Sequence, residues 1–330
     1  MKKVLLTSTA LILSAGIAAA EVTVGGDGRM GIIDRDDAAG LQFTSRIRIS
    51  FAASGETDGG LTFGGSIRAD NAGASATGAT SATVLVNDAA GRTPGSALYV
   101  PTFLTTTSVT NGGGGVNGFA GNVFVSGAFG KLSMGDVSGA AEKAVGDLSG
   151  VGLTGLGDLN AATYLLNNTG RGSLRPNALY EYSFGDVTLY ASAETPAFSN
   201  AGYGIGAKYS PGTYTVAIGY ESVDFGGAIG TLDHVIIGGS ANFAGATIKA
   251  LYGNLENAFD DQYGLSADYT FGATTVTAFA INQFDGEVDY GLGGSYDLGG
   301  GAALKGGVVR NNFPGGGDTT AFDFGMSMSF

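Results

Sequence analysis

The end of the chain, TAFDFGMSMSF from Thr320 to Phe330, decides the fold. Large apolar side chains occupy every second position, and small or polar side chains occupy the positions between them. The apolar set is Phe322, Phe324, Met326, Met328 and Phe330, and the other set is Ala321, Asp323, Gly325, Ser327 and Ser329. Successive side chains of a β-strand point to opposite faces, so this period of two predicts a strand with one apolar face and one small, polar face.

Runs with the same alternation recur along the chain, separated by short turns centred on glycine. The turns are Phe129-Gly130-Lys131, Phe184-Gly185-Asp186, Pro211-Gly212-Thr213, Ala244-Gly245-Ala246, Phe271-Gly272-Ala273 and Leu298-Gly299-Gly300. The runs between them are about ten residues, the length of a tilted strand that crosses a membrane. Longer, mostly acidic connections, such as residues 34–37 and 256–261, alternate with these turns. The pattern predicts an all-β chain that forms a sixteen-stranded antiparallel transmembrane β-barrel, with both termini on the side of the short turns.

Residues 1–20 predict a signal peptide, so we expect the mature chain to begin at Glu21. Lys2 and Lys3 form a positive start, residues 4–15 are apolar, and Ala18 to Ala20 provide small residues before the cleavage point. The apolar run is too short to span a bilayer as a helix, which needs about 20 residues. We therefore expect export, followed by membrane insertion through strands.

The composition excludes several classes of protein. Acidic residues outnumber basic ones by 29 to 16, which argues against nucleic acid as a partner because such proteins present a basic face. Cysteine is absent and His234 is the single histidine, so thiol nucleophiles, thiolate zinc sites and sites with two imidazoles are excluded. His234 stands beside Asp233 with no catalytic motif around it. We therefore expect a surface histidine, no catalytic residues, no enzyme and no cofactor.

Two connections are much longer than the others, residues 71–117 and residues 137–176. Structureless loops of this length are uncommon unless they have a function. The first is rich in Gly, Ala, Thr and Ser, and it predicts a long external loop. Barrels of sixteen strands leave a wide aqueous lumen. We therefore expect the second connection to fold inward as a constriction loop, within one barrel that spans residues 21–330.

Several glycine-rich stretches, taken in their order and spacing, resemble the trimeric sixteen-stranded general porins of Rhodobacter-type alphaproteobacteria. They are residues 26–31 (GDGRMG), 57–66 (TDGGLTFGGS), 124–131 (FVSGAFGK), 134–136 (MGD), 271–276 (FGATTV) and 290–301 (YGLGGSYDLGGG), together with the terminal Phe330. The resemblance covers most of the mature chain. It implies a homotrimer in the outer membrane of a Gram-negative bacterium, with the third external loop folded into a water-filled pore. Ions and small hydrophilic solutes would diffuse passively through that pore.

The resemblance also implies an inner loop rich in carboxylates that faces basic side chains on the barrel wall. The candidate acids are Asp136, Glu142, Asp147 and Asp158, and the candidate bases are Arg29, Arg46, Arg48, Arg68, Arg171 and Arg175. The first four arginines fall on the polar face of the first three predicted strands, opposite in phase to Met30, Ile47, Ile49 and Ile67. An arginine facing lipid at the bilayer midplane costs about 2–4 kcal/mol, so we expect these four in the lumen. The chain departs from the family at Gly150 and Gly155, where relatives carry acids, and in its long 71–117 loop.

Other interpretations compete with an open channel. A secreted glycine-rich solenoid would need tandem calcium-binding repeats, and the stretch from Gly25 to Gly28 has no tandem copy. An outer-membrane adhesin, or a barrel plugged by the 71–117 loop, is the main alternative. The resemblance allows bound calcium, although no calcium-loop pattern is present. The acidic external loops favour a weak preference for cations, and they suggest contact with lipopolysaccharide through shared divalent cations.

Overall fold

The computed structural model describes residues 21–37, 40–72, 79–86, 102–109, 120–166, 178–194, 201–226, 230–256, 260–312 and 317–330. The chain divides into two compact units, Met1–Asp70 together with Gly118–Phe330, and Asn71–Asn117. The predicted signal peptide, Arg171 and Arg175 lie outside the described residues.

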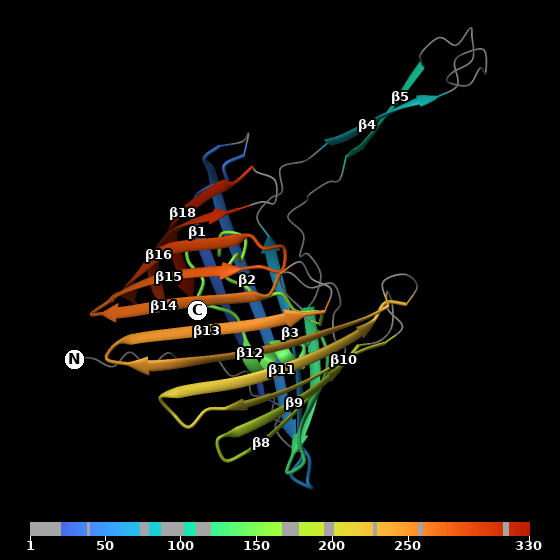
Figure 1. Cartoon of the computed structure of the whole chain (residues 1–330), viewed down its shortest axis with the longest axis vertical. Coiled ribbons are helices and arrows are strands. Elements are labelled where there is room, and N and C mark those ends of the chain that lie inside the picture. Colours follow the sequence, from blue (N-terminus) through green and yellow to red (C-terminus); the bar gives the residue numbers. More distant parts are fainter. Residues whose placement is uncertain are drawn as a thin grey trace. The chain divides into compact units, whose positions relative to one another are not determined.

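Sixteen strands of the larger unit close into an antiparallel barrel (Figure 1). In the order of their neighbours they are β1 (Glu21–Asp34), β18 (Thr319–Ser329), β17 (Ala302–Asn311), β16 (Val288–Gly299), β15 (Thr274–Asn282), β14 (Gln262–Phe271), β13 (Ala246–Leu255), β12 (Thr231–Phe243), β11 (Tyr214–Asp224), β10 (Ala201–Tyr209), β9 (Val187–Ala193), β8 (Ala178–Phe184), β7 (Gly130–Gly135), β6 (Ala120–Gly127), β3 (Thr62–Ala72) and β2 (Gln42–Glu56). Strands that follow each other in the chain are neighbours, except that β3 pairs with β6. The predicted sixteen-stranded antiparallel barrel is confirmed.

The last strand closes the barrel against the first. β18 pairs antiparallel with β1, from Ser329 opposite Asp27 to Phe322 opposite Asp34. The terminal residue extends this pairing, because the backbones of Gly26 and Phe330 exchange hydrogen bonds of 2.8 and 3.0 Å. Closure removes the free strand edges, which would carry unpaired backbone groups into the membrane.

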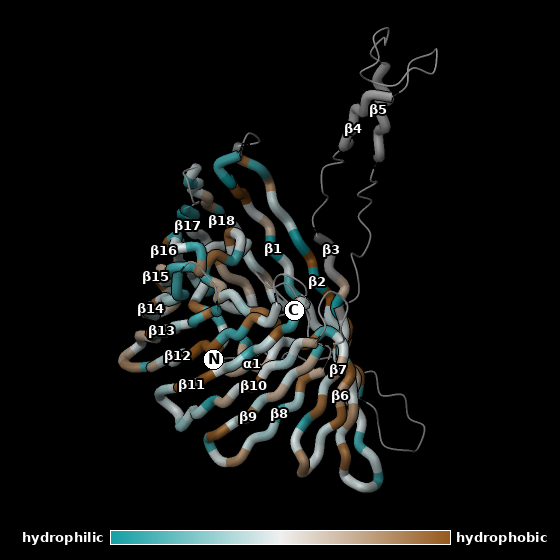
Figure 2. The backbone as a smooth tube through the Cα atoms, turned by 45° about the vertical axis from the view of Figure 1, so that its right-hand side comes forward, coloured by the Kyte–Doolittle hydropathy of each residue, from teal (hydrophilic) through white to brown (hydrophobic). Residues whose placement is uncertain are grey.

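Exposure alternates along the strands with the period that the sequence predicts. In β18, Phe322 and Phe324 are 42% and 53% exposed, whereas Asp323 between them is 2% exposed. In β11, Ile218 is exposed and Glu221 is fully buried. The large apolar side chains therefore point outward, and the small or polar ones point into the barrel, as expected for a wall that faces lipid. Figure 2 shows hydrophilic residues gathered where β1 turns into β2, at an end of the wall.

The unit Asn71–Asn117 contains a two-stranded antiparallel sheet of its own. It consists of β4 (Ala79–Val86) and β5 (Thr102–Val109), with Val84 opposite Leu104 in the register. The prediction from the sequence is a loop here, with no strands. Ala, Thr and Ser make up most of both strands, and the apolar residues stand mainly next to one another, so no apolar alternation marks the strands.

The helix α1 (Ala140–Val145) follows β7 and is not predicted from the sequence. Six residues are too few to show a helical period. Within the described residues, no helix is long and apolar enough to cross a membrane.

Residues 137–166, which include α1, lie inside the barrel, and we call them the inner segment. Helix α1 packs against β9, β10, β11 and β12. Farther along, Leu148, Val151 and Leu159 form a buried apolar cluster with wall residues, including Ile236 and Phe279. The barrel therefore has a hydrophobic core on one side of its lumen, between the inner segment and the wall.

Candidate functional site

The inner segment lies flat on the wall because glycines line its course. A Cβ atom on Gly206 of β10 would approach the carbonyl oxygen of Ala140 to 2.5 Å, and one on Gly293 of β16 would approach Cβ of Val151 to 2.8 Å. Similar close approaches occur at Gly219 of β11, Gly238 of β12, Gly264 of β14, Gly307 of β17 and Gly325 of β18. Any larger residue at these positions would push the inner segment toward the centre of the barrel.

Polar side chains of the wall bind the first part of the inner segment, from Ala140 to Leu153. The Ala140 N–H donates to Oγ of Ser192 on β9 at 2.9 Å. The Ser149 N–H donates to Oγ of Ser266 on β14 at 2.9 Å. The far end reaches β18, where Leu153 N–H donates to Oδ1 of Asp323 at 2.8 Å.

The inner segment then turns back along the wall. Thr163 N–H donates to Oε1 of Gln262 on β14 at 3.2 Å, and Leu165 N–H donates to Oε2 of Glu221 on β11 at 2.8 Å. The first part of the inner segment and its returning part therefore both lie on the wall from β8 to β18, and the far end touches β1 as well. The remaining wall of β2, β3, β6 and β7 carries Arg46, Arg48, Arg68 and Lys131.

The arginines of β1 and β2 lie together, as their strand positions predict. Arg29 and Arg46 are direct partners in the register, and Arg48 is the partner of Asp27. Nη2 of Arg46 forms an ion pair with Oδ1 of Asp27 at 2.8 Å. Arg68 lies on β3, the neighbour of β2, and its side chain is exposed. The outward positions between these arginines hold exposed apolar residues, Met30, Ile47 and Ile67 among them.

Arg29 of the wall contacts the inner segment directly. Its Nη1 donates to the carbonyl oxygen of Thr154 at 3.1 Å and approaches that of Leu153 at 3.5 Å. Asp158 and Arg29 line one cavity of about 460 Å³, together with Arg35. An acid of the inner segment and a base of the wall thus face the same water-accessible space.

The other predicted acids occupy different surroundings. Asp136 directly follows β7 and is half-buried, and Glu142 is half-buried in α1. Asp147 accepts a hydrogen bond from the Ala162 N–H at 2.9 Å and so ties the outgoing and returning parts of the inner segment together. Burial raises the pKa of the Asp147 carboxyl above its ordinary value, because the charged form loses its hydration.

A second cavity, of about 400 Å³, lies beside Leu153 and is lined by Arg29, Arg46, Lys305 and Asp297 among others. Lys305 is not among the bases predicted from the sequence. Its place on β17, two positions from Gly307, puts it on the strand face that contacts the inner segment, and this was the signal that could have identified it. Arginines are more conspicuous because several fall on adjacent strands.

The wall carboxylates that hold the inner segment are also not among the residues predicted from the sequence. Asp323 and Glu221 are 2% and 0% exposed, and both accept backbone N–H groups of the inner segment. Each is a single acid among small residues on the inward face of its strand, and that pattern was the available signal. Their partners lie far away in the sequence, so the strand pattern alone does not identify their role.

The expectation of a surface position for His234 is wrong, because its side chain is 1% exposed. Its Nδ1 lies 2.9 Å from Oε2 of Glu221. The rings of Tyr164 and Phe284 approach edge-on, with centroids 6.0 and 5.5 Å away. The returning part of the inner segment brings Tyr164 over the histidine, and the sequence does not reveal this cover.

Within the described residues, no group of three or more histidine, aspartate or glutamate side chains is placed to hold a metal ion. The calcium that the resemblance allows therefore stays a prediction, and no step of the function is assigned to it.

The chain is similar to known proteins in sequence and fold. The family model for Gram-negative porins matches residues 7–316. A porin of Rhodobacter capsulatus is 34% identical over 89% of this chain and 95% of its own length, and a porin of Fuscovulum blasticum is 28% identical over 94% of this chain and 100% of its own. A refined crystal structure of a porin has 30% identity and a TM-score of 0.70, covering 94% of this chain and 100% of that one. A triple mutant of Rhodopseudomonas blastica porin has the same coverage, with 21% identity and a TM-score of 0.64, and shares the fold.

Proposed function

This chain belongs to the family of Gram-negative porins, which are outer-membrane channels and not enzymes, and we propose that its solutes pass between the inner segment and the wall of β1, β2, β3, β6 and β7. One observation carries this proposal. The inner segment is held flat against β9 to β18, so the open part of the lumen lies on the opposite side. Ions and small hydrophilic solutes diffuse passively through this water-filled path.

The charges around the path give it selectivity. Arg46, Arg48 and Arg68 stand on the open wall, and Asp158 lies on the exposed side of the inner segment. Opposed charges across a narrow aqueous passage create a transverse field that orients polar solutes, and lining charge sets the preference among ions. Placing any of these arginines against lipid would cost free energy, which supports their place in the lumen.

A weak preference for cations follows from the charge balance. Acidic residues outnumber basic ones in the chain, and the acids at the longer-loop end include Asp34, the last residue of β1, and Asp36, Asp260 and Asp285 in the connections. Such acids raise the local concentration of cations at the mouth. They also suit divalent cations shared with lipopolysaccharide. The arginines at the constriction oppose this preference without removing it.

The functional unit is a homotrimer, and the distribution of tyrosine on the wall supports this part of the proposal. The tyrosines of the described wall strands all lie between β8 and β16, and they are Tyr180, Tyr182, Tyr190, Tyr203, Tyr209, Tyr214, Tyr220, Tyr252, Tyr263, Tyr269, Tyr290 and Tyr296. In the described residues of β17, β18, β1, β2, β3, β6 and β7 there is none. Ten of these tyrosines are exposed, whereas Tyr190 is buried against the inner segment. Exposed tyrosine marks the boundary between membrane and water. We infer that the tyrosine-rich sector faces lipid and that the tyrosine-free sector faces other copies of the chain.

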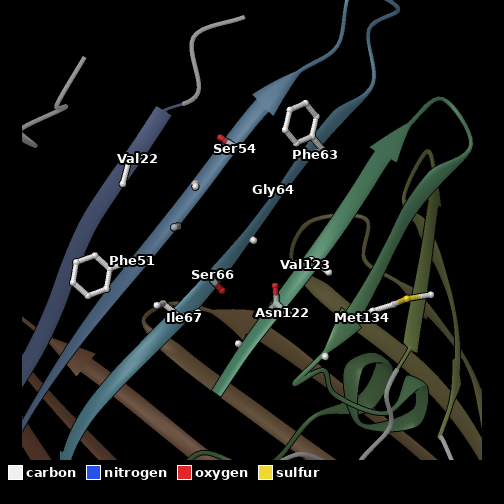
Figure 3. Close-up of a pocket in the computed structure, with 15 residues that line it drawn as sticks. Val22, Phe51, Ser54, Phe63, Gly64, Ser66, Ile67, Asn122, Val123 and Met134 are labelled. Atoms are coloured by element: carbon white, nitrogen blue, oxygen red, sulfur yellow. The ribbon is translucent and has the colours of Figure 1, made fainter. Parts of the chain in front are cut away.

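An outward groove in the tyrosine-free sector supports the same assignment (Figure 3). Its volume is about 790 Å³, and its exposed apolar side chains include Phe51, Phe63, Val123 and Met134, which come from β2, β3, β6 and β7. Gly65 and Gly121 also line it. Glycines between large apolar side chains let another surface approach closely, which favours a packed partner over loose lipid chains.

Planar-bilayer recordings of the refolded protein test the position of the path. We expect large conductance steps that close in units of three, and a reversal potential of weak cation preference in a salt gradient. Replacing Arg46→Gln should shift the reversal potential farther toward cations. The matched control is Arg310→Gln, because Arg310 is also paired with a carboxylate, Asp318 at 2.7 Å, but lies at the end of β17. Equal shifts in both variants would contradict the proposed path.

A further inference from the structure

Two buried carboxylates of the wall bind the inner segment in the same way. Oδ1 of Asp323 accepts Leu153 N–H at 2.8 Å, and its Oδ2 accepts Thr154 N–H at 2.6 Å. Oε2 of Glu221 accepts Leu165 N–H at 2.8 Å, and its Oε1 accepts Leu166 N–H at 3.1 Å. Each carboxylate thus receives two consecutive backbone donors, one on each oxygen. Such charge-assisted bonds are shorter and stronger than bonds between neutral groups.

Further contacts fix both carboxylates and the peptides that they hold. Oγ1 of Thr154 donates a third hydrogen bond to Asp323 at 2.7 Å, and Arg29 binds the carbonyl oxygen of Thr154 from the other side. At the second point, His234 contacts Oε2 of Glu221 at 2.9 Å. Leu166 and Val223, both fully buried, pack in one apolar cluster there. The backbone donors at both points, and the carbonyl oxygen of Thr154 at the first point, are therefore bound by wall residues.

The two points mark the ends of one stretch of the inner segment. Residues 153–154 are held at β18 and β1, and residues 165–166 are held at β11. Asp158, which faces the cavity shared with Arg29, lies between them. We propose that Asp323 and Glu221 are positioning residues that set the aperture of the pore by holding both ends of this stretch on the wall. This inference rests on the proposed path between the inner segment and the arginine wall.

The variants Asp323→Asn and Glu221→Gln test the inference with little change in size. An amide replaces one accepting oxygen by a donor, which repels the backbone N–H that the oxygen had bound. We expect the stretch to leave the wall and enter the lumen. Single-channel recordings should then show at least a twofold fall in mean conductance and a clear increase in open-channel current noise. The reversal potential should change little, because both carboxylates are buried away from the path.

Asp186→Asn provides the charge-matched control, since Asp186 lies exposed in the turn between β8 and β9. It should conduct like the unchanged protein. Conductance and noise in Asp323→Asn and Glu221→Gln that equal those of this control would overturn the inference. If these two variants fail to refold, Thr154→Val removes one bond to Asp323 and leaves the wall intact. Increased noise in Thr154→Val supports the inference, and unchanged noise contradicts it.

The outcomes also separate this inference from the proposed function. An unchanged protein that folds as a barrel and does not conduct would remove the proposed path itself. A different outcome would remove only the positioning role. In that outcome the unchanged protein conducts and Arg46→Gln shifts its selectivity, but the two carboxylate variants conduct with the same current and noise as the control.

Discussion

At the scale of single residues, side chains of one type on one face have different roles. Strand alternation predicts an inward position for both Arg29 and Arg46, and both point inward. Arg46 pairs with Asp27 on the adjacent strand, whereas Arg29 binds Thr154, 125 residues away. The direction of a side chain follows from a period of two, but its partner follows from the path of the inner segment. Sequence reasoning therefore predicts the basic cluster and misses the contact between Arg29 and the inner segment.

Two aspartates outside the wall strands should affect stability with opposite dependence on pH. Burial raises the pKa of Asp147, so its charged form is less favourable in the fold than in the unfolded chain. Asp147→Asn should raise the apparent unfolding temperature in detergent at pH 7. That gain should shrink as the pH falls through the raised pKa of Asp147 toward the ordinary aspartate value, because protonation then neutralises the native side chain as well.

Asp261 provides the opposite case. Hydrogen bonds from Tyr252 and Asn254 lower the pKa of Asp261, so its charged form stabilises the fold. Asp261→Asn should lower the unfolding temperature at pH 7, and the loss should vanish as the pH falls below the ordinary aspartate pKa and through the lowered one. Differences of the same sign for both variants, or differences independent of pH, would contradict these assignments.

At the scale of elements, the alternation of apolar and polar residues predicts the wall strands but not the other elements. All sixteen wall strands follow from a period of two between glycine turns, because each strand has one face toward lipid and one toward water. The sheet of β4 and β5 and the helix α1 do not follow, since neither has such faces. The course of the inner segment also escapes prediction. It depends on glycines such as Gly206 and Gly293, which a single sequence cannot distinguish from the other glycines of the chain.

The role of the wall glycines can be tested on adjacent positions of β16. A Cβ atom on Gly293 would lie 2.8 Å from Cβ of Val151, whereas one on Gly294 would meet nothing closer than 3.5 Å. Gly293→Ala should therefore displace the inner segment, at about 1–3 kcal/mol for the overpacking, and lower the single-channel conductance. Gly294→Ala should conduct normally and refold in the same yield. If both variants conduct alike, the close approach at Gly293 is not needed to keep the pore open.

At the scale of the whole molecule, the wall is divided into two sectors of different chemistry. Tyrosines such as Tyr209 and Tyr269 are exposed on the sector from β8 to β16. The sector from β17 through β1 to β7 shows exposed Phe, Val, Ile and Met, together with the groove of Figure 3. A barrel surrounded by lipid on every side would need the same interfacial residues around its full circumference. This asymmetry links the residue composition of the strands to the assembly of several copies.

The absence of cysteine makes the assembly testable with one introduced thiol at a time. Val123 and Leu265 are 64% and 53% exposed in the single chain, but Val123 lies in the groove and Leu265 lies on β14 in the tyrosine-rich sector. In the proposed trimers reconstituted in bilayers, a nitroxide label attached to Leu265→Cys should collide readily with oxygen dissolved in the lipid, and one attached to Val123→Cys should do so several-fold less often. In single chains in denaturant, both labels should be equally accessible to oxygen, which controls for the label itself. Frequent collisions at Val123→Cys in the intact assembly would show that lipid covers the groove, and the contact between copies would then have to lie on another part of the wall.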